Sequence, residues 1–138
     1  WFIDEGKVIL SESSGDGKES KVYRSHGPRL FNDKLGFVVL VNGGSASASE
    51  ILAGALKEHG IATIVGEKTY GKGSVQELVK ISDDTSLKVT IANWLTPNGV
   101  SISLKGITPD VIVPYTQKDY DAKKDPQMDK AVEILLKK

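Results

Sequence analysis

The sequence lacks cysteine altogether and has only two histidines and one methionine among its 138 residues. Without cysteine there is no disulfide, no thiol nucleophile and no zinc site built from thiolates. No apolar run approaches the roughly 20 residues that a membrane-spanning helix needs. Excess charge of one sign is also missing, since 18 Lys plus Arg balance 18 Asp plus Glu. This balance argues against nucleic-acid binding driven by bulk positive charge.

The residues that are present can bury a core, because 39% are hydrophobic and 26% are charged, as in ordinary globular domains. The length fits one domain or a part of one. Residues 1–6 are typical of the end of a helix closed by a glycine. Residues 7–12 and 19–25 predict one β-hairpin, and residues 75–81 and 86–94 predict another.

The centre of the chain predicts a strand–helix–strand unit. Five consecutive apolar residues at 37–41 (FVVLV) indicate a buried central strand that is apolar on both faces. Helical spacing of apolar residues predicts a helix over 47–59 that stops at Gly60. Residues 61–65 (IATIV) predict a second buried strand. Short links around one helix favour parallel pairing of the two strands.

The C-terminal third predicts a short strand at 110–114 and an amphipathic helix over 127–138. One apolar stripe is expected on that helix: Met128, Ala131, Val132 and Leu135. Together these elements predict an α/β fold, whose ligand sites lie outside the carboxyl ends of parallel strands. The two loops at that position carry the following polar residues: Ser45, Ser47, Ser49 and Glu50 in the first, and Glu67, Lys68, Lys72 and Gln76 in or just after the second.

These loops bring together the residue types of a serine nucleophile and its base. A serine hydroxyl attacks well only when a neighbour takes its proton. His59 lies at the far end of the helix, roughly 18 Å from Ser47 at 1.5 Å per residue, whereas His26 in a loop is not excluded by spacing. Lys72, which lies between two glycines, can serve instead if burial favours its neutral form. The amide of Ala48, in the first helical turn, is free to stabilise an oxyanion.

Structural interpretations of the same residues remain open. Ser47-x-x-Glu50 is also the pattern of a capping box, and a lysine in a glycine loop is commonly a solvated turn residue. The stretch from Gly66 to Lys72 narrowly misses a phosphate-binding loop, because Gly73 stands where that loop needs Ser or Thr.

Three stretches resemble the C-terminal processing peptidases, also called tail-specific proteases: VVLVNGGSASASEILAGAL (38–56), VGEKTYGKGSVQ (65–76) and, more loosely, WLTPNGVSIS with GITPDVIVP (94–103 and 106–114). The resemblance implies a serine peptidase with a Ser–Lys dyad on a crotonase-like (ClpP-like) α/β core. It implies no metal or organic cofactor.

The resemblance also assigns roles to individual residues. It implies that Ser47 is the nucleophile and that Lys72 is the general base. Gln76 is expected to orient the lysine, Ala48 to supply one amide of the oxyanion hole, and Glu50 to support the site structurally.

Members of this family carry a PDZ domain and a glycine-rich segment, which supplies the other oxyanion-hole amide, before the matching region. We therefore expect residues 1–138 to be the C-terminal part of the catalytic core, without the PDZ domain and the upstream core segment, and inactive as an isolated piece. The family implies protein or peptide substrates cut in their C-terminal region, an oligomer as an option, and a periplasmic or other extracytoplasmic location in the bacterial envelope. The alternatives are a non-catalytic module that binds peptides or assembles with a partner, and a crotonase-like acyl-CoA enzyme.

Overall fold

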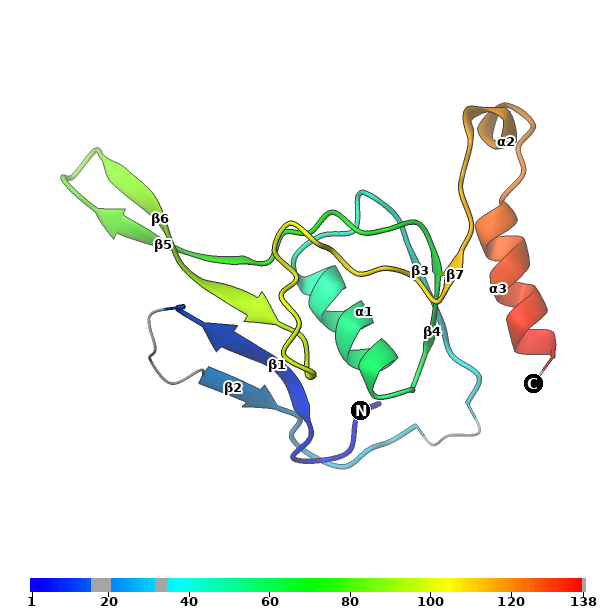
Figure 1. Cartoon of the computed structure of the whole chain (residues 1–138), viewed down its shortest axis with the longest axis horizontal. Helices are drawn as coiled ribbons and strands as arrows, with labels where there is room; N and C mark the ends of the chain where they lie inside the picture. Colours follow the sequence, from blue (N-terminus) through cyan, green and yellow to red (C-terminus); the bar gives the residue numbers. More distant parts are fainter. Residues whose placement is uncertain (16–20, 32–34, 138) are drawn as a thin grey trace.

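The computed structural model describes residues 1–15, 21–31 and 35–137. Residues 19–20 of the second predicted strand and Lys138 of the last predicted helix lie outside these ranges. Figure 1 shows two sheets on either side of one central helix, with a two-stranded ribbon projecting at one end and a helix at the other. In the described ranges, no helix combines the length and the apolar character needed to cross a membrane.

The predicted strand–helix–strand unit is confirmed. Strands β3 (Val38–Val41) and β4 (Thr63–Gly66) pair in parallel, and helix α1 (Ala48–Glu58) connects them. Strand β7 (Val111–Ile112) pairs in parallel with β4 on its other side. The helix stops before Gly60, which has a φ of 65°, a left-handed conformation that glycine adopts without strain.

The position of β3 in the sheet differs from the prediction. The order is β3-β4-β7, so β3 is an edge strand among the described strands and β4 is central. The apolar run at 37–41 is explained instead by helices on both faces: α1 covers one side of this sheet, and α3 (Pro126–Leu136) packs on β3 and β4 from the other. Apolar residues on both faces therefore indicate a sandwiched strand and not necessarily a central one.

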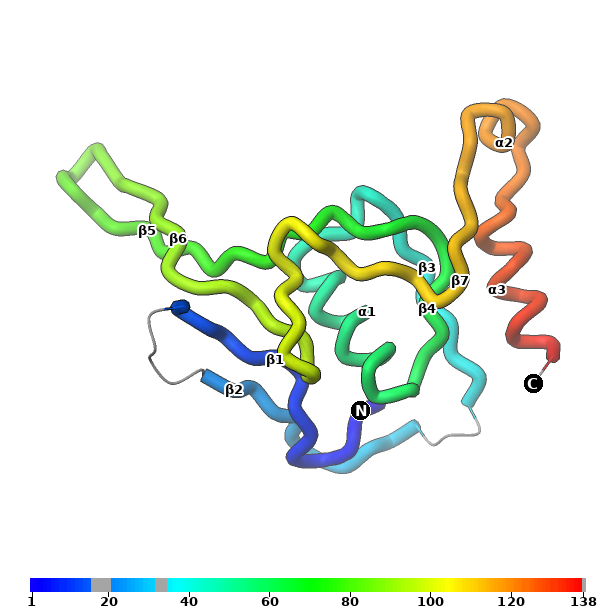
Figure 2. The backbone as a smooth tube through the Cα atoms, in the orientation of Figure 1, coloured from blue at the N-terminus to red at the C-terminus, as the bar shows by residue number. Residues whose placement is uncertain are grey.

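The two predicted hairpins form one antiparallel sheet. Its strands are β1 (Val8–Ser13), β2 (Lys21–Arg24), β5 (Ser74–Lys80) and β6 (Ser86–Leu95), in the order β2-β1-β6-β5. The hairpins join where the end of β1 pairs with the end of β6. The rest of β5 and β6 continues past this junction as the projecting ribbon (Figure 2).

The N-terminal prediction was wrong, because residues 1–6 form no helix. They make a turn into β1, in which Gly6 has a φ of 79° and donates its amide to Ser25 O at 3.0 Å. The Phe2 side chain packs this segment against two other aromatic rings. Its ring centroid lies 4.7 Å from that of Phe31 and 4.9 Å from that of Phe37. Phe2 and Phe37 also pack against the main core.

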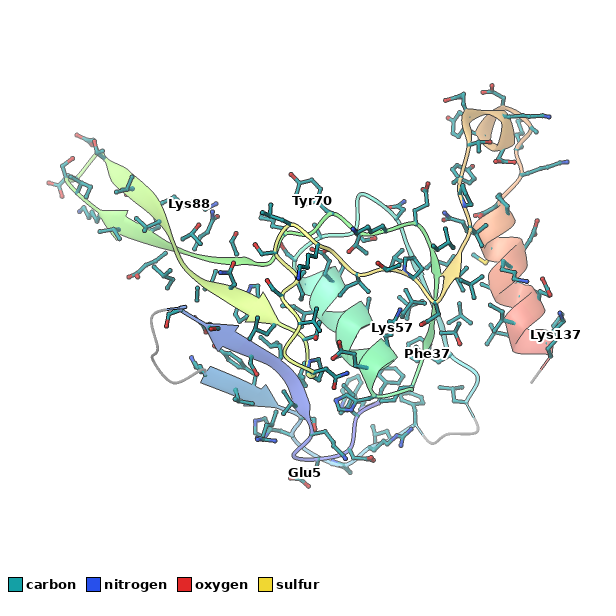
Figure 3. All side chains as sticks on the ribbon, in the orientation of Figure 1. Glu5, Phe37, Lys57, Tyr70, Lys88 and Lys137 are labelled. Atoms are coloured by element: carbon teal, nitrogen blue, oxygen red, sulfur yellow. The ribbon has the colours of Figure 1, made fainter. Side chains whose placement is uncertain are left out.

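The core lies between α1 and the two sheets. Its buried residues are Ile3, Val41, Ala53, Ala55, Leu56, Ala62 and Ile64. At the C-terminal end of α1, Lys57 Nζ pairs with the Asp110 carboxylate at 3.0 Å and donates to Thr108 O at 2.6 Å (Lys57 is labelled in Figure 3). Asp110 also accepts from the Ile64 amide at 2.8 Å. These contacts of Lys57 and Asp110 join the end of the helix to β4 and to the segment that precedes β7.

The C-terminal region differs from the prediction in two respects. A short helix, α2 (Gln117–Asp121), precedes α3 and begins at a Thr116 cap. In α3, Gln127 and Ala131 are buried, whereas three members of the predicted stripe are 41% to 48% exposed: Met128, Val132 and Leu135. Gln127 Nε2 donates to Val113 O at 2.8 Å, so the buried face of the helix includes a polar residue that the apolar stripe did not predict.

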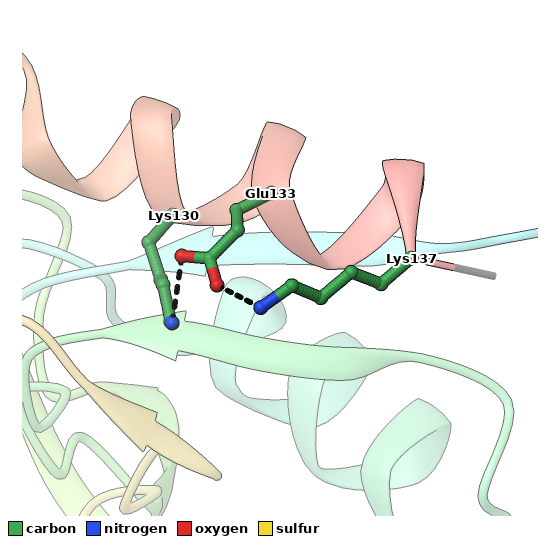
Figure 4. A network of polar contacts seen from close by, with 3 residues as sticks. All are labelled: Lys130, Glu133 and Lys137. Carbon is green, nitrogen blue, oxygen red and sulfur yellow. Dashed lines mark hydrogen bonds and ion pairs between the residues drawn. The ribbon is translucent and has the colours of Figure 1, made fainter.

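Glu133 on α3 lies between Lys130 of the same helix and Lys137, the residue that follows its last turn (Figure 4). It accepts from Lys130 Nζ at 2.8 Å and from Lys137 Nζ. These hydrogen bonds, and the charges that accompany them, lower the pKa of the Glu133 carboxyl from 4.5 to about 2. A carboxyl with a lowered pKa stabilises the fold above its unfolded pKa, and this stabilisation is lost as the pH falls through the folded pKa.

We therefore predict that Glu133→Gln removes a stabilising contribution that is fully present above about pH 4.5 and lost between about pH 4.5 and pH 2. Thermal unfolding followed by circular dichroism across this range measures it. The melting temperatures of wild type and variant should converge as the pH falls. Asp129→Asn on the same helix is the matched control, and an equal convergence for that variant would contradict the assignment.

Candidate active site

The two loops that the sequence places together do meet. The loop after β3 carries Ser45, whose carbonyl oxygen accepts a hydrogen bond from Tyr70 N at 3.0 Å in the loop after β4. Glu67 N, at the start of that second loop, donates to Val41 O at 2.9 Å. Both loops leave the carboxyl ends of parallel strands, as the fold rule predicts.

The Glu50 side chain is the centre of this arrangement. It lies in the first turn of α1 and is 0% exposed. Its Oε1 accepts from Thr69 Oγ1 at 2.5 Å and from Gly71 N at 2.6 Å. Its Oε2 accepts from Ser47 N at 3.0 Å and from Lys72 N at 2.9 Å. One buried carboxylate thus joins both candidate loops.

These contacts bring the two candidate catalytic residues together at the backbone. Because Ser47 N and Lys72 N bond to the same oxygen, the two nitrogens lie within 5.9 Å of each other, the sum of the two distances. Four donors on two oxygens match the acceptor capacity of an ionised carboxylate. A buried charge is stable only when it is satisfied in this way.

Thr69 is a site residue that the sequence interpretation missed. Its hydroxyl donates to Glu50 and accepts from Ile107 N at 2.7 Å, while Thr69 N donates to Ile107 O at 3.1 Å. The loop after β4 is thereby fastened to a segment almost forty residues later. Only the position of Thr69 three residues before Lys72 could have suggested its role, and a single threonine in a loop carries little signal.

Ser47 immediately precedes α1 and has a strained backbone, with φ 55° and ψ −117°. Non-glycine residues adopt such angles at a cost of order 1–3 kcal/mol, and they cluster at functional sites. By position Ser47 and Glu50 form a capping box, and Glu50 fulfils its half through Ser47 N. The Ser47 hydroxyl makes no side-chain cap hydrogen bond, because the Glu50 amide donates to Ser47 O at 2.9 Å. The half-buried hydroxyl is therefore not consumed by helix capping.

Ala48 is the first residue of α1 and is exposed. Its amide precedes the first intrahelical hydrogen bonds and has no acceptor within the helix. It stands next to the Ser47 side chain in the sequence, at the positive end of the helix dipole. The arrangement provides one donor for a negatively charged oxygen.

Lys72 and Gln76 are both exposed. Gly71 has a φ of 88°, and a Cβ on Gly73 would lie 2.2 Å from Ser103 N, so both neighbours of Lys72 must be glycines. Within the described part of the chain, the Lys72 ammonium has no hydrogen bond or ion pair. The burial that would favour a neutral lysine, as the sequence interpretation requires, is thus not provided by the described residues.

The two histidines lie away from this arrangement. His59 caps the far end of α1, and its Nε2 lies 2.7 Å from Val8 O. His26 lines a cavity of about 240 Å³ beside the second half of α1, and neither Ser47 nor Lys72 lines that cavity. Across residues 1–15, 21–31 and 35–137, no group of three or more His, Asp or Glu side chains is placed to hold a metal ion.

The remaining polar residues of the two loops take other positions. The Ser45 hydroxyl accepts from Asn42 N at 3.1 Å and so closes the turn after β3. Ser49 is exposed on the first turn of α1. Glu67 and Lys68 line an open cavity of about 470 Å³ at the carboxyl ends of the parallel strands. None of these side chains is a hydrogen-bond partner of the Glu50 carboxylate.

We predict that Glu50→Gln lowers the free energy of unfolding by about 3 kcal/mol, because an amide nitrogen would face donors that now have a charged acceptor. Urea unfolding measures this change. Glu77→Gln, an exposed glutamate on β5, should change stability by less than about 0.5 kcal/mol. Equal effects of the two substitutions would show that the buried carboxylate is not a stabilising centre.

Comparison with known proteins places the chain in a family. Peptidase family S41 matches residues 1–113. A carboxy-terminal-processing protease of Bartonella bacilliformis is 42% identical over 131 residues, which cover 87% of this chain and 28% of that protein. A protein of Staphylococcus aureus described as a probable CtpA-like serine protease is 42% identical over 113 residues, or 81% of this chain and 22% of that protein.

Among solved structures, the photosystem II D1 C-terminal processing protease is similar with a TM-score of 0.73 and 39% sequence identity. The similarity covers 82% of this chain and 28% of that one. The chain thus spans less than a third of the length of these relatives. It belongs to peptidase family S41, with the C-terminal processing serine proteases.

Proposed function

We propose that the protein is a serine endopeptidase in which Ser47 is the nucleophile, Lys72 the general base and Ala48 N one donor of the oxyanion hole. The observation that carries the proposal is the shared carboxylate oxygen of Glu50, which holds the backbones of Ser47 and Lys72 within 5.9 Å. Gln76, four residues after Lys72, is proposed to orient the amine. The strained Ser47 backbone and its uncapped hydroxyl support the nucleophilic role.

The proposed reaction has two halves. Ser47 Oγ attacks the carbonyl carbon of the scissile amide while its proton passes to Lys72 Nζ, and the carbonyl oxygen takes the electron pair beside Ala48 N–H. Collapse of this intermediate breaks the C–N bond, and the leaving amine takes the proton from Lys72. Water then attacks the acyl-enzyme, Lys72 accepts its proton, and the Ser47 oxygen regains a proton as the acid product leaves.

The proposed mechanism needs a neutral Lys72 amine, but the Lys72 side chain is exposed to water. A general base must be neutral when it accepts a proton, and contact with water favours the ammonium form. We therefore propose that Lys72 is covered in the working enzyme, by bound substrate or by parts of the whole protein. Loss of water contact would then favour the neutral form of the amine, because no described carboxylate pairs with the ammonium form.

We also propose the wider properties that the resemblance of the sequence to this family implies. The core is proposed to be crotonase-like, and the substrates to be proteins or peptides cut in their C-terminal region, as the names of the relatives indicate. A PDZ domain and a glycine-rich segment that supplies the second oxyanion-hole amide are proposed for the whole protein, and its location is proposed to be extracytoplasmic.

A second candidate function is a non-catalytic module that binds peptides. The observation in its favour is again the exposure of Lys72, which removes the environment that a lysine base needs. Labelling of the full-length protein with a fluorophosphonate, which acylates activated serines, separates the two functions. Labelling at Ser47 supports the enzyme, and its absence supports the binding module.

We predict that Ser47→Ala and Lys72→Ala each reduce kcat of the full-length protein by at least about a thousandfold, because the two groups act as a unit. Cleavage of a peptide with a fluorogenic reporter measures the loss, and circular dichroism checks the fold. Lys68→Ala on the same loop is the matched control, because it also removes an exposed lysine side chain but one that lines the cavity with Glu67 and not the Glu50 network. Undiminished turnover in either dyad variant would exclude the dyad.

We further predict that kcat/KM rises with pH as Lys72 loses its proton, because only the neutral amine can accept one from Ser47. A pH–rate profile of the full-length protein measures this rise. Lys72→Arg should be inactive across the same range, because a guanidinium stays protonated. Activity that is independent of pH, or that is retained in the arginine variant, would contradict the role of base.

A further inference from the structure

The ribbon formed by β5 and β6 begins at the candidate site. Lys72 and the start of β5 at Ser74 are separated by one residue. From there the ribbon runs outward beyond its junction with β1, and Lys88 marks its projecting part in Figure 3. An isolated two-stranded ribbon is marginally stable in water, because it buries little. Its position and its exposure together suggest that it receives another segment.

The hydrogen-bond register shows which backbone groups of β5 face outward. Ile81 N donates to Thr85 O at 2.9 Å at the distal end, and Trp94 N donates to Gly73 O at the proximal end. Antiparallel pairs alternate between bonded and non-bonded positions, and the register shifts once, after Val75. Counted from either end, the odd-numbered residues of β5 occupy the bonded positions and the even-numbered residues the non-bonded positions. The N–H and C=O groups of four residues therefore point away from β6: Ser74, Gln76, Leu78 and Lys80.

No described strand pairs with this outward edge. In the described part of the chain β5 is the last strand of its sheet, and only β6 pairs with it. The opposite edge of the ribbon differs, because the base of β6 is already paired with β1 through Asn93–Leu95. A strand added beside β6 would meet the end of β1, whereas a strand added beside β5 would lead directly to Lys72.

The side chains of the ribbon divide into two faces. Residues opposite each other in an antiparallel pair share a face, so one face is mainly apolar: it carries Val79, Ile81, Leu87 and Val89, which are 36% to 63% exposed, and one charged residue, Glu77, opposite Val89. The other face carries polar residues such as Gln76, Lys88 and Thr90 together with Leu78. A peptide strand beside β5 would place every second side chain on the apolar side.

We propose that the free edge of β5 binds the substrate as an added β-strand, which delivers its scissile bond to Ser47. The proposal rests on the proposed function and specifies its substrate class: an extended, unfolded segment with apolar side chains at alternate positions. Backbone hydrogen bonds give affinity that is independent of sequence, and the apolar face gives a preference with a period of two. The bound strand would also pass beside Lys72 and help to exclude water from its amine.

The test uses the full-length protein and substitutions at one cross-strand pair. Leu78 and Lys88 are partners, and their amides point to opposite edges of the ribbon. Leu78→Pro removes a donor from the β5 edge and should lower kcat/KM for a fluorogenic peptide by about threefold to tenfold, the value of one backbone hydrogen bond. Lys88→Pro removes the matching donor from the β6 edge and should stay within about twofold of wild type. Equal losses in the two variants would overturn the proposal.

A second measurement leaves the protein unchanged. A series of substrate peptides is N-methylated at one backbone nitrogen at a time, and kcat/KM should fall at alternate positions only. A series without this period of two would overturn the proposal. Labelling of Ser47 by a fluorophosphonate is measured alongside, because it needs the nucleophile and not the edge. Loss of labelling in the wild type counts against the proposed function, whereas intact labelling without periodicity counts against the strand-binding edge alone.

Discussion

The arrangement of the site depends on one buried carboxylate. Glu50 contributes four hydrogen bonds, and its donors come from both loops that leave the parallel sheet. Without such an acceptor, the amides of Ser47, Gly71 and Lys72 would be buried or half-buried polar groups held in tight turns, at a cost of 1–3 kcal/mol for each unsatisfied one. The carboxylate therefore organises the loops in place of direct contact between their side chains. Thr69 extends the same network to Ile107.

Local glycines permit this geometry. Gly73 approaches the backbone of Ser103 so closely that any side chain would collide with it, and Gly71 occupies a left-handed conformation. Lys72 stands between them and donates its amide inward while its side chain remains exposed. The backbone amide of Lys72 thus belongs to the hydrogen-bond network of Glu50. The side-chain amine takes no part in that network.

Much of the framework follows from sequence patterns because those patterns reflect local physics. The apolar runs at 37–41 and 61–65 and the helix between them predict the parallel unit, and Gly60 predicts where the helix ends. Neither the aromatic packing of Phe2 nor the bond from Gln127 to Val113 has a local signature. For that reason the turn at residues 1–6 and the polar residue on the buried face of α3 could not be predicted. The edge position of β3 could not be predicted either, because helices can cover both faces of an edge strand as fully as those of a central one, and the sequence pattern reports only the faces.

The candidate site could be predicted only in part. The meeting of two loops follows from the rule for parallel sheets, and the pattern Ser47-x-x-Glu50 was open to either a cap or a site. The structure shows that the glutamate takes part in both, since it accepts from the amide before the helix and from the distant loop. The link from Thr69 to Ile107 joins residues 38 positions apart, and no local pattern reports a contact of that range.

The hydrogen bonds of Glu50 all end at Lys72 or before it, whereas β5 begins only at Ser74. The loop that carries Lys72 and the projecting ribbon are consequently held by different contacts: the loop by the buried carboxylate, and the ribbon by the pairing of β5 with β6. Substitutions in the distal ribbon, beyond Gln76, therefore leave every hydrogen bond of that carboxylate intact. The outer end of the ribbon can thus diverge between relatives without loosening the junction of the two loops.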